Sequence, residues 1–134
     1  MKDEVFSNVT WGNEWSGTIA LANGKTATFE IDFPATDESI PEAARKSLQF
    51  IVENEPVIRH NIAASMTELY KDWNDNETIA AEELAQRINL TEVQIWEEGA
   101  GVLYWEPDGD FFTDHTIMAY LEANGEISEP QLEG

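Results

Sequence analysis

The sequence contains no cysteine and few basic residues, and both shortages narrow the possible functions. Without cysteine the chain cannot form disulfides, zinc–thiolate sites or a thiol nucleophile. Its 7 Lys and Arg residues stand against 27 Asp and Glu residues, which gives a formal net charge of -20 at pH 7. Because contacts to phosphate depend on Lys and Arg, this balance disfavours binding to nucleic acid or to an anionic membrane.

Long apolar runs and known catalytic motifs are also missing. No apolar run approaches the length that spans a bilayer, and Met1–Val5 lacks the apolar segment of a signal peptide. We therefore expect a cytoplasmic protein. The sequence has no glycine-rich dinucleotide motif, phosphate-binding loop, nucleophile elbow or zinc-protease helix pair. This absence lowers the expectation of an enzyme without excluding one.

The apolar and aromatic content is that of a folded protein. The chain has 134 residues with 5 Trp, 6 Phe and 3 Tyr, and 42% of its residues are hydrophobic. A chain of this length buries a core without disulfides or metals, and this composition argues against disorder despite the charge. We expect a single acidic domain over residues 1–134.

An N-terminal hairpin is predicted between Trp15 and Phe33, where apolar residues alternate around an Asn-Gly pair. A two-residue turn would mix the two faces of the hairpin. A three-residue loop over Ala22–Gly24, with Gly24 left-handed, places Ile19 opposite Ala27 and keeps the faces distinct.

Three helices are predicted after this hairpin. The first begins at a capping box at Ser39 and carries an apolar stripe as far as Val52. The segment Asn54–Pro56 is expected to break it and to start a second helix that ends near Trp73. A third, shorter helix is expected to be capped by Thr78 and to bury Ile79, Leu84 and Ile88.

The C-terminal third is predicted to return to strands. We expect these at Val93–Glu97, Val102–Trp105 and Phe112–Leu121, with a short return strand around Ile127 and a frayed tail over Glu129–Gly134. Apolar residues occupy both faces of the second strand, so alternation alone leaves its buried face open.

A second three-residue loop, Ala123–Gly125, places Leu121 beside Ile127. The predicted fold is therefore α+β. It has a mainly antiparallel sheet of about five or six strands, and three helices inserted between an N-terminal hairpin and a C-terminal meander. The helices should pack together on one face of the sheet.

The negative charge is unevenly distributed along the chain. Residues 88–134 contain eleven acidic side chains and no Lys or Arg. Solubility is the simplest interpretation of such charge. The alternative is a basic protein partner, which this acidic end would attract. Both a monomer and a homodimer joined through a sheet edge remain open.

A candidate binding surface combines aromatic side chains with carboxylates, a mixture suited to receiving Lys and Arg. The alternative is that its aromatic residues pack beneath a helix. The candidate residues are Glu30, Asp32, Trp96, Asp114, Met118, Tyr120 and Glu122.

His115 is the residue that suggests catalysis. A small hydrolytic or metal-dependent enzyme could use it with Asp108 and Asp110. However, His115 shares its strand face with Ile117 and Leu121, which instead favours a half-buried structural histidine bonded to a carboxylate or to the backbone.

The acidic loop is a candidate calcium site through the carboxylates of Glu106, Asp108 and Asp110. Its spacing differs from that of an EF-hand loop. Pro107 and Gly109 explain a turn without any metal. No other cofactor is expected.

Two motifs resemble a known bacterial family. Trp73-Asn74 at the predicted end of the second helix, and Gly109–Ile117 before the last long strand, are similar to the pattern of domain of unknown function 2262. The resemblance covers roughly residues 39–121. It implies a fold and a bacterial origin but no chemistry. Small acidic α+β proteins also resemble, in type, immunity proteins that neutralise toxins. We therefore expect an immunity-like or antitoxin-like protein that binds a basic partner.

Overall fold

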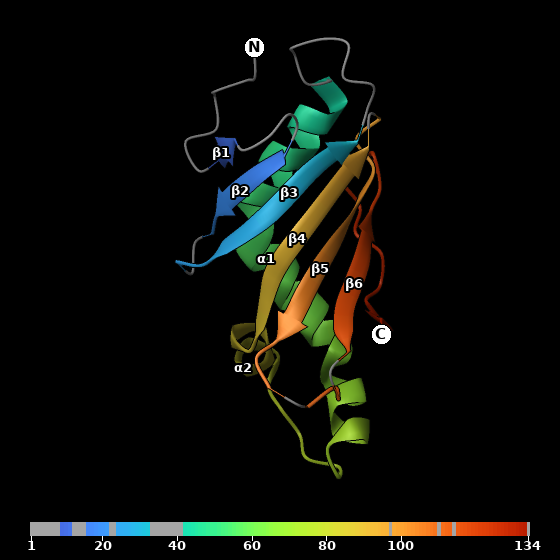
Figure 1. The fold of residues 1–134 in the computed structure, drawn as a ribbon. Helices are drawn as coiled ribbons and strands as arrows, with labels where there is room; N and C mark the ends of the chain where they lie inside the picture. The colour runs from blue at the N-terminus through green and yellow to red at the C-terminus, as the bar shows by residue number, and fades with distance from the viewer. Residues whose placement is uncertain are drawn as a thin grey trace.

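The computed structural model describes most of the chain as one sheet backed by helices (Figure 1). The described residues are 9–11 (backbone only), 16–21, 24–32, 42–96, 98–109, 111–113 and 115–133. The strands are β1 (Val9–Trp11), β2 (Ser16–Ala20), β3 (Thr26–Asp32), β4 (Ile88–Trp96), β5 (Gly101–Pro107), β6 (Thr116–Leu121) and β7 (Gln131–Glu133). The helices are α1 (Glu42–Trp73) and α2 (Ala81–Gln86).

The sheet is mixed and mostly antiparallel. The seven strands within the described residues lie side by side in the order of the sequence, and among them only β3 and β4 run parallel. Parallel neighbours need a crossover connection, and the segment containing α1 and α2 supplies it. The predicted α+β class, with helices between a hairpin and a meander, is confirmed. The sheet is slightly larger than predicted because two strands of three residues, β1 and β7, lie at its edges.

The N-terminal hairpin has the predicted three-residue loop. The Leu21 N–H donates to the Lys25 carbonyl at 2.8 Å, and Gly24 has a φ of 83°. Ile19 lies opposite Ala27, as the alternation requires. The local pattern alone therefore determined this register.

The C-terminal end is partly as predicted. Leu121 forms a bridge with Ile127, and Gly125 between them is left-handed with a φ of 93°. The prediction of a frayed tail over residues 129–134 was wrong, because Gln131–Glu133 pair with β6 as β7. Leu132 packs against the core, and this burial holds the short strand in place.

The prediction of three helices was wrong, because α1 is continuous where two helices were expected. It runs through Pro56, which is exposed. Residues on both sides of the proline belong to one buried stripe, made up of Leu48, Ile51, Glu55, Ile58, Ile62 and Met66. A proline inside a helix costs about 3 kcal/mol, whereas each large apolar side chain gains about 1.5–3 kcal/mol on burial. The free energy gained by burying the whole stripe against the sheet therefore outweighs the cost of the proline.

The start of α2 and of β4 also differ from the prediction. Ala80 is the residue before α2, and no side chain caps it, so Thr78 is not its cap. Leu84 is buried by α2, while Ile88 already belongs to β4. The helix is short because the buried Ile88 and Leu90 alternate with half-buried positions, and this strand period continues along β4.

The last long strand begins later than predicted. Phe111–Thr113 form a turn, with Thr113 at a φ of 51°, and β6 starts at Thr116. Phe111 and Phe112 are buried against Tyr70 of α1, with ring centroids 5.5 and 6.3 Å from its ring. The two phenylalanines leave the sheet because they fill the space beneath the end of α1.

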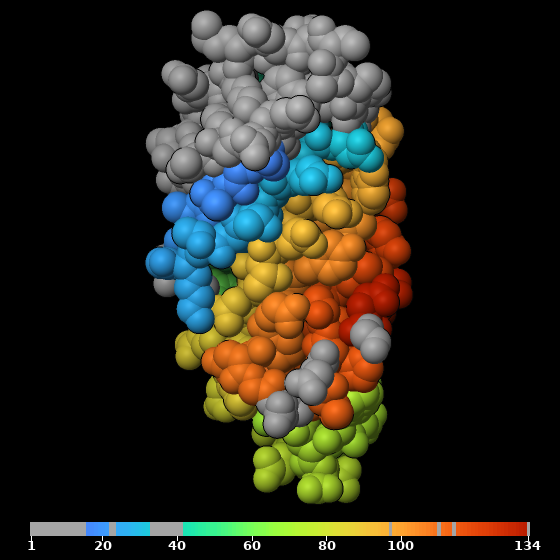
Figure 2. Space-filling view, in the orientation of Figure 1, coloured from blue at the N-terminus to red at the C-terminus, as the bar shows by residue number. Residues whose placement is uncertain are grey.

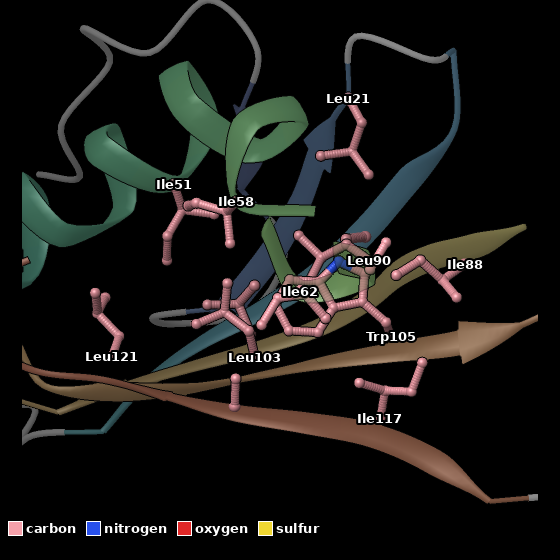
Figure 3. Packing of buried hydrophobic residues seen from close by; sticks show 14 of the residues in the cluster. Leu21, Ile51, Ile58, Ile62, Ile88, Leu90, Leu103, Trp105, Ile117 and Leu121 are labelled. Atoms are coloured by element: carbon pink, nitrogen blue, oxygen red, sulfur yellow. The ribbon is translucent and has the colours of Figure 1, made fainter. Parts of the chain in front are cut away.

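The core lies between the sheet and α1. Figure 3 shows Leu103 and Trp105 of β5 facing Ile58 and Ile62 of the helix. Leu103 and Trp105 are fully buried. The buried face of β5, which alternation left open, is therefore the face carrying these two residues.

Candidate functional site

The candidate site is the outer face of the sheet, which is the face turned away from α1 (Figure 2). Alternation along each strand sends one set of side chains into the core and the other set to this face. The outer-face residues include Thr18, Thr28, Glu30, Asp32, Glu92, Gln94, Trp96, Val102, Tyr104, Glu106, Thr116, Met118, Tyr120, Gln131 and Glu133.

The charge on the outer face has a single sign. The seven strands contain five carboxylates and no Lys or Arg. All five carboxylates are exposed on the outer face, and they are Glu30, Asp32, Glu92, Glu106 and Glu133. The outer face thus carries negative charge that no basic side chain of its own strands offsets.

Five of the six described basic residues lie in α1 or directly after α2, and several of them pair with nearby carboxylates, whereas Lys25 lies in the turn between β2 and β3. Arg45 and Lys46 both lie within 4.0 Å of Glu42 in the first turns of α1. Arg87, which follows α2, pairs with Asp108 at 3.4 Å. The described basic side chains are therefore concentrated on the helical side, whereas carboxylates occur on both sides.

Two rows of cross-strand neighbours organise the outer face. In the first row Glu30, Gln94, Val102 and Tyr120 are successive neighbours from β3 to β6. The second row likewise runs through Thr28, Glu92, Tyr104, Met118 and Gln131. Each row joins charged or polar residues to an apolar or aromatic pair on β5 and β6.

The apolar residues of the two rows, Val102 and Met118, lie outside the main core. Val102 and Met118 are only 4% and 5% exposed, yet neither belongs to the core cluster between sheet and helix. Tyr120 beside them is 42% exposed, and Tyr104 is half-buried. Outer-face side chains therefore form a small apolar centre that a helix does not cover.

A pocket of about 310 Å³ opens next to this centre. Its lining residues are Thr91, Glu92, Tyr104, Glu106, Thr116 and Glu133. The Thr116 hydroxyl donates to the Glu106 carboxylate at 2.9 Å and orients it. Burial raises the pKa of the Tyr104 hydroxyl, and the negative charges of Glu92 and Glu133 raise it further. The carboxylates of Glu92, Glu106 and Glu133 thus all border the same small pocket.

The predicted binding residues are partly brought together. Glu30, Asp32, Trp96, Met118 and Tyr120 all lie on the outer face, and Trp96 is the cross-strand neighbour of Asp32. Glu122 is exposed in the turn after β6, at the end of the sheet. Asp114 lies outside the described residues.

Sequence reasoning missed Glu92, Tyr104 and Glu133 as members of this surface. Glu92 shares its parity with Gln94 and Trp96, so extending the predicted strand backward from Val93 would have found it. Glu133 was hidden by the prediction of a frayed tail. Tyr104 had no local signal, because both faces of its strand are apolar in sequence.

His115 lies at the edge of the sheet beside the end of α1. Its ring meets the ring of Trp73 edge to face at 5.4 Å, and its Nδ1 lies 3.3 Å from the Glu133 carbonyl oxygen. It is half-buried, as the structural interpretation predicted. Asp108, its proposed partner, is engaged by Arg87. Asp110 is outside the described residues, so the enzymatic hypothesis stays a prediction.

The calcium site also stays a prediction. Glu106 accepts a hydrogen bond from Thr116, and Asp108 pairs with Arg87. The third predicted ligand, Asp110, is not among the described residues. Within the described part of the chain, no group of three His, Asp or Glu side chains is arranged to hold a metal ion.

A buried ion pair inside the core was not anticipated. Glu55 is 1% exposed, and the Arg59 Nε lies 3.2 Å from its carboxylate. Burial raises the pKa of Glu55, while Arg59 and the nearby indole of Trp105 oppose that shift. The sequence signal was its position, because Glu55 lies between Ile51 and Ile58 on the apolar stripe of α1.

The residues of the first family motif have a structural role. The Asn74 amide donates to the carbonyl of Tyr70 at 2.7 Å and to that of Phe111 at 3.0 Å. It therefore ties the end of α1 to the turn before β6. Trp73 packs edge to face on Phe112 at 6.2 Å and supports the same junction.

The fold and its outer face define an α+β protein whose sheet presents carboxylates and tyrosines away from its helices. The chain belongs to the bacterial family described as "Uncharacterized protein conserved in bacteria (DUF2262)", which it matches over residues 3–132. This match confirms the resemblance seen in the two motifs and extends it beyond them. No curated protein and no solved structure matches the chain. Among the described helices, none is long and apolar enough to cross a membrane.

Proposed function

We propose that this protein is a non-enzymatic interaction protein that binds a basic protein partner, in the manner of an immunity protein or antitoxin. One observation carries the proposal. All five carboxylates of the strands lie on the outer face, and the strands contribute no Lys or Arg to offset them.

Electrostatic attraction is the expected consequence of this arrangement. Like charges gathered on one surface repel each other, and cationic side chains of a partner relieve that repulsion on binding. The field also steers a basic partner toward the outer face and speeds its association at low ionic strength. The helical side supports this less well, because five of the six described basic side chains lie there beside its own carboxylates.

Capture followed by reconstitution tests the proposal. The protein is immobilised, exposed to a bacterial lysate at low salt and eluted with a salt gradient, and each retained protein is identified and purified. We expect a basic protein whose association rate constant falls about tenfold or more from low to physiological ionic strength. Stopped-flow or surface-based kinetics with the purified pair measures this. Retention of no basic protein, or binding indifferent to salt, would overturn the proposal.

A further inference from the structure

The outer face has an apolar centre within its negative charge, and this combination specifies more than a basic partner. We infer that the outer face docks a partner surface on which arginine or lysine side chains surround an apolar side chain. This inference rests on the proposed function and names the chemistry of the partner at that site.

The apolar centre is a compact group on the two strands β5 and β6. Val102 faces Tyr120, and Tyr104 faces Met118, so the four residues occupy adjacent rows. Val102 and Met118 are almost fully shielded from water, while Tyr120, the cross-strand neighbour of Val102, is 42% exposed and is the member of this group most open to a partner. Interfaces of specific complexes have this form, with aromatic residues at a dry centre and polar groups around it.

Carboxylates border this centre on two sides. Along the rows toward β3, Glu92 is the cross-strand neighbour of Tyr104, and Glu30 lies beyond Gln94 in the row of Val102. At another side Glu106 and Glu133 line the pocket beside Tyr104. A partner with cations around an apolar side chain therefore matches the outer face in charge as well as in polarity.

The pocket beside Tyr104 suits one such cation. At about 310 Å³ it has room for the end of a long basic side chain. A guanidinium group can stack on an aromatic ring and bond carboxylates at its edge, which a more compact ammonium group does less well. Tyr104 supplies the ring, and Glu92 and Glu133 supply the carboxylates.

The aromatic residues and the carboxylates of the outer face should contribute to binding in different ways. Truncation of an exposed aromatic anchor removes short-range contacts, so it should weaken affinity at every salt concentration. Neutralisation of the bordering carboxylates should weaken binding mainly at low salt, because it removes long-range attraction.

The test uses a synthetic hexapeptide of alternating arginine and leucine, with a matched peptide in which glutamine replaces arginine. Titration of the isotope-labelled protein by NMR locates the site. We expect amide shifts on β4, β5 and β6 with the arginine peptide and none with the glutamine peptide. Shifts that map to α1, or no shifts at all, would overturn the inference even if a basic protein partner has been captured.

Variants then separate the apolar centre from general charge. We expect Tyr120→Ala to weaken the peptide Kd about tenfold with an unchanged salt dependence, and Tyr120→Phe to restore it. The double variant Glu92→Gln/Glu133→Gln should weaken binding and flatten the salt dependence. The control Glu53→Gln/Glu68→Gln makes the same charge change at exposed positions of α1 and should alter the Kd less than about twofold.

The outcomes distinguish this inference from the proposed function. If the α1 control weakens binding as much as the outer-face pair, charge alone governs binding; this inference then fails while a basic partner remains supported. If Tyr120→Ala has no effect, the apolar centre takes no part and the inference also fails. Circular dichroism and thermal unfolding check that each variant is folded. We expect them all to be folded, because every substituted residue is exposed and none belongs to the core cluster.

Discussion

At the scale of single residues, the buried pair of Glu55 and Arg59 is the least expected feature of the core. Both carboxylate oxygens of Glu55, the Arg59 Nε and the Trp105 indole nitrogen are buried without a well-formed hydrogen bond in the described structure. Such a pair gives weak evidence of stability, because removing two charges from water costs about as much as their attraction returns. Its clearest consequence is a dependence of stability on pH.

The pH dependence can be predicted in sign. Burial raises the pKa of Glu55 above its ordinary value of 4.5, so the folded chain holds this proton more tightly than the unfolded chain. Its contribution to stability is then most favourable below about pH 4.5 and declines as the pH rises through the folded pKa. We expect wild-type stability, relative to Glu55→Gln, to fall in urea unfolding as the pH rises above the ordinary carboxyl pKa of 4.5.

The matched control for this experiment is Glu53→Gln, an exposed carboxylate on the same helix. The difference in free energy of unfolding between Glu53→Gln and the wild type should change less with pH than the difference for Glu55→Gln. If Glu55→Gln and Glu53→Gln follow the wild type in parallel at all pH values, the buried carboxyl does not titrate as described.

At the scale of elements, α1 shows how tertiary packing overrides a local break. Asn54, Glu55 and Pro56 form a segment that is typical of a helix end. In the structure, the Asn54 amide instead donates to the Phe50 carbonyl at 2.9 Å, and the helix continues. The helix therefore retains an unfavourable residue in its middle.

Substitution of this proline should stabilise the protein. Pro56 is exposed, so Pro56→Ala leaves the core unchanged and restores a backbone N–H to the helix. A loss of about 0.4–1 kcal/mol through the more flexible unfolded chain offsets part of the gain. We expect a net increase of about 2 kcal/mol in the free energy of unfolding, measured by urea denaturation.

Val57→Ala is the appropriate comparison, because Val57 is the next residue along and is 61% exposed. That substitution should change stability by less than about 0.5 kcal/mol. A Pro56→Ala protein no more stable than Val57→Ala would show that the helix accommodates the proline without cost.

At the scale of the whole molecule, the described basic side chains lie mainly on the helical side, while carboxylates lie on both sides. The net charge of -20 favours solubility but also repels itself within the folded state. The helical side carries local ion pairs, whereas the outer face of the sheet has five strand carboxylates and no strand cation. Repulsion among the outer-face carboxylates is therefore not offset by any cation of the same strands.

Salt should consequently stabilise the free protein. Raising NaCl from about 10 mM to about 150 mM shortens the screening length from about 30 Å to about 8 Å. We expect the midpoint of thermal unfolding to rise by about 3–5 °C, which corresponds to about 1 kcal/mol for a chain of this size. The variant Glu92→Gln/Glu106→Gln/Glu133→Gln should show a smaller rise. A midpoint that does not depend on salt in either protein would contradict this account.

The sequence predictions were correct for features that depend on neighbouring residues and wrong for features that depend on residues far apart in the chain. The hairpin loop at Gly24 and the bridge from Leu121 to Ile127 were predicted because strand alternation and glycine conformation are local properties. The continuity of α1 and the pairing of Gln131–Glu133 were missed because both depend on burial against distant strands. The binding surface was predicted in part, since parity identified Glu30 and Asp32 but not Tyr104.

The sequence by itself determined the excess of negative charge, the absence of cysteine chemistry, the α+β class and which residues share a face of each hairpin. These follow from composition and from periods of two and 3.6 residues, which depend only on neighbouring positions. The tertiary structure alone decided which face of the sheet α1 covers. That choice left the carboxylates, Tyr104 and Tyr120 together on the outer face, because a helix can bury its apolar stripe against only one side of a sheet.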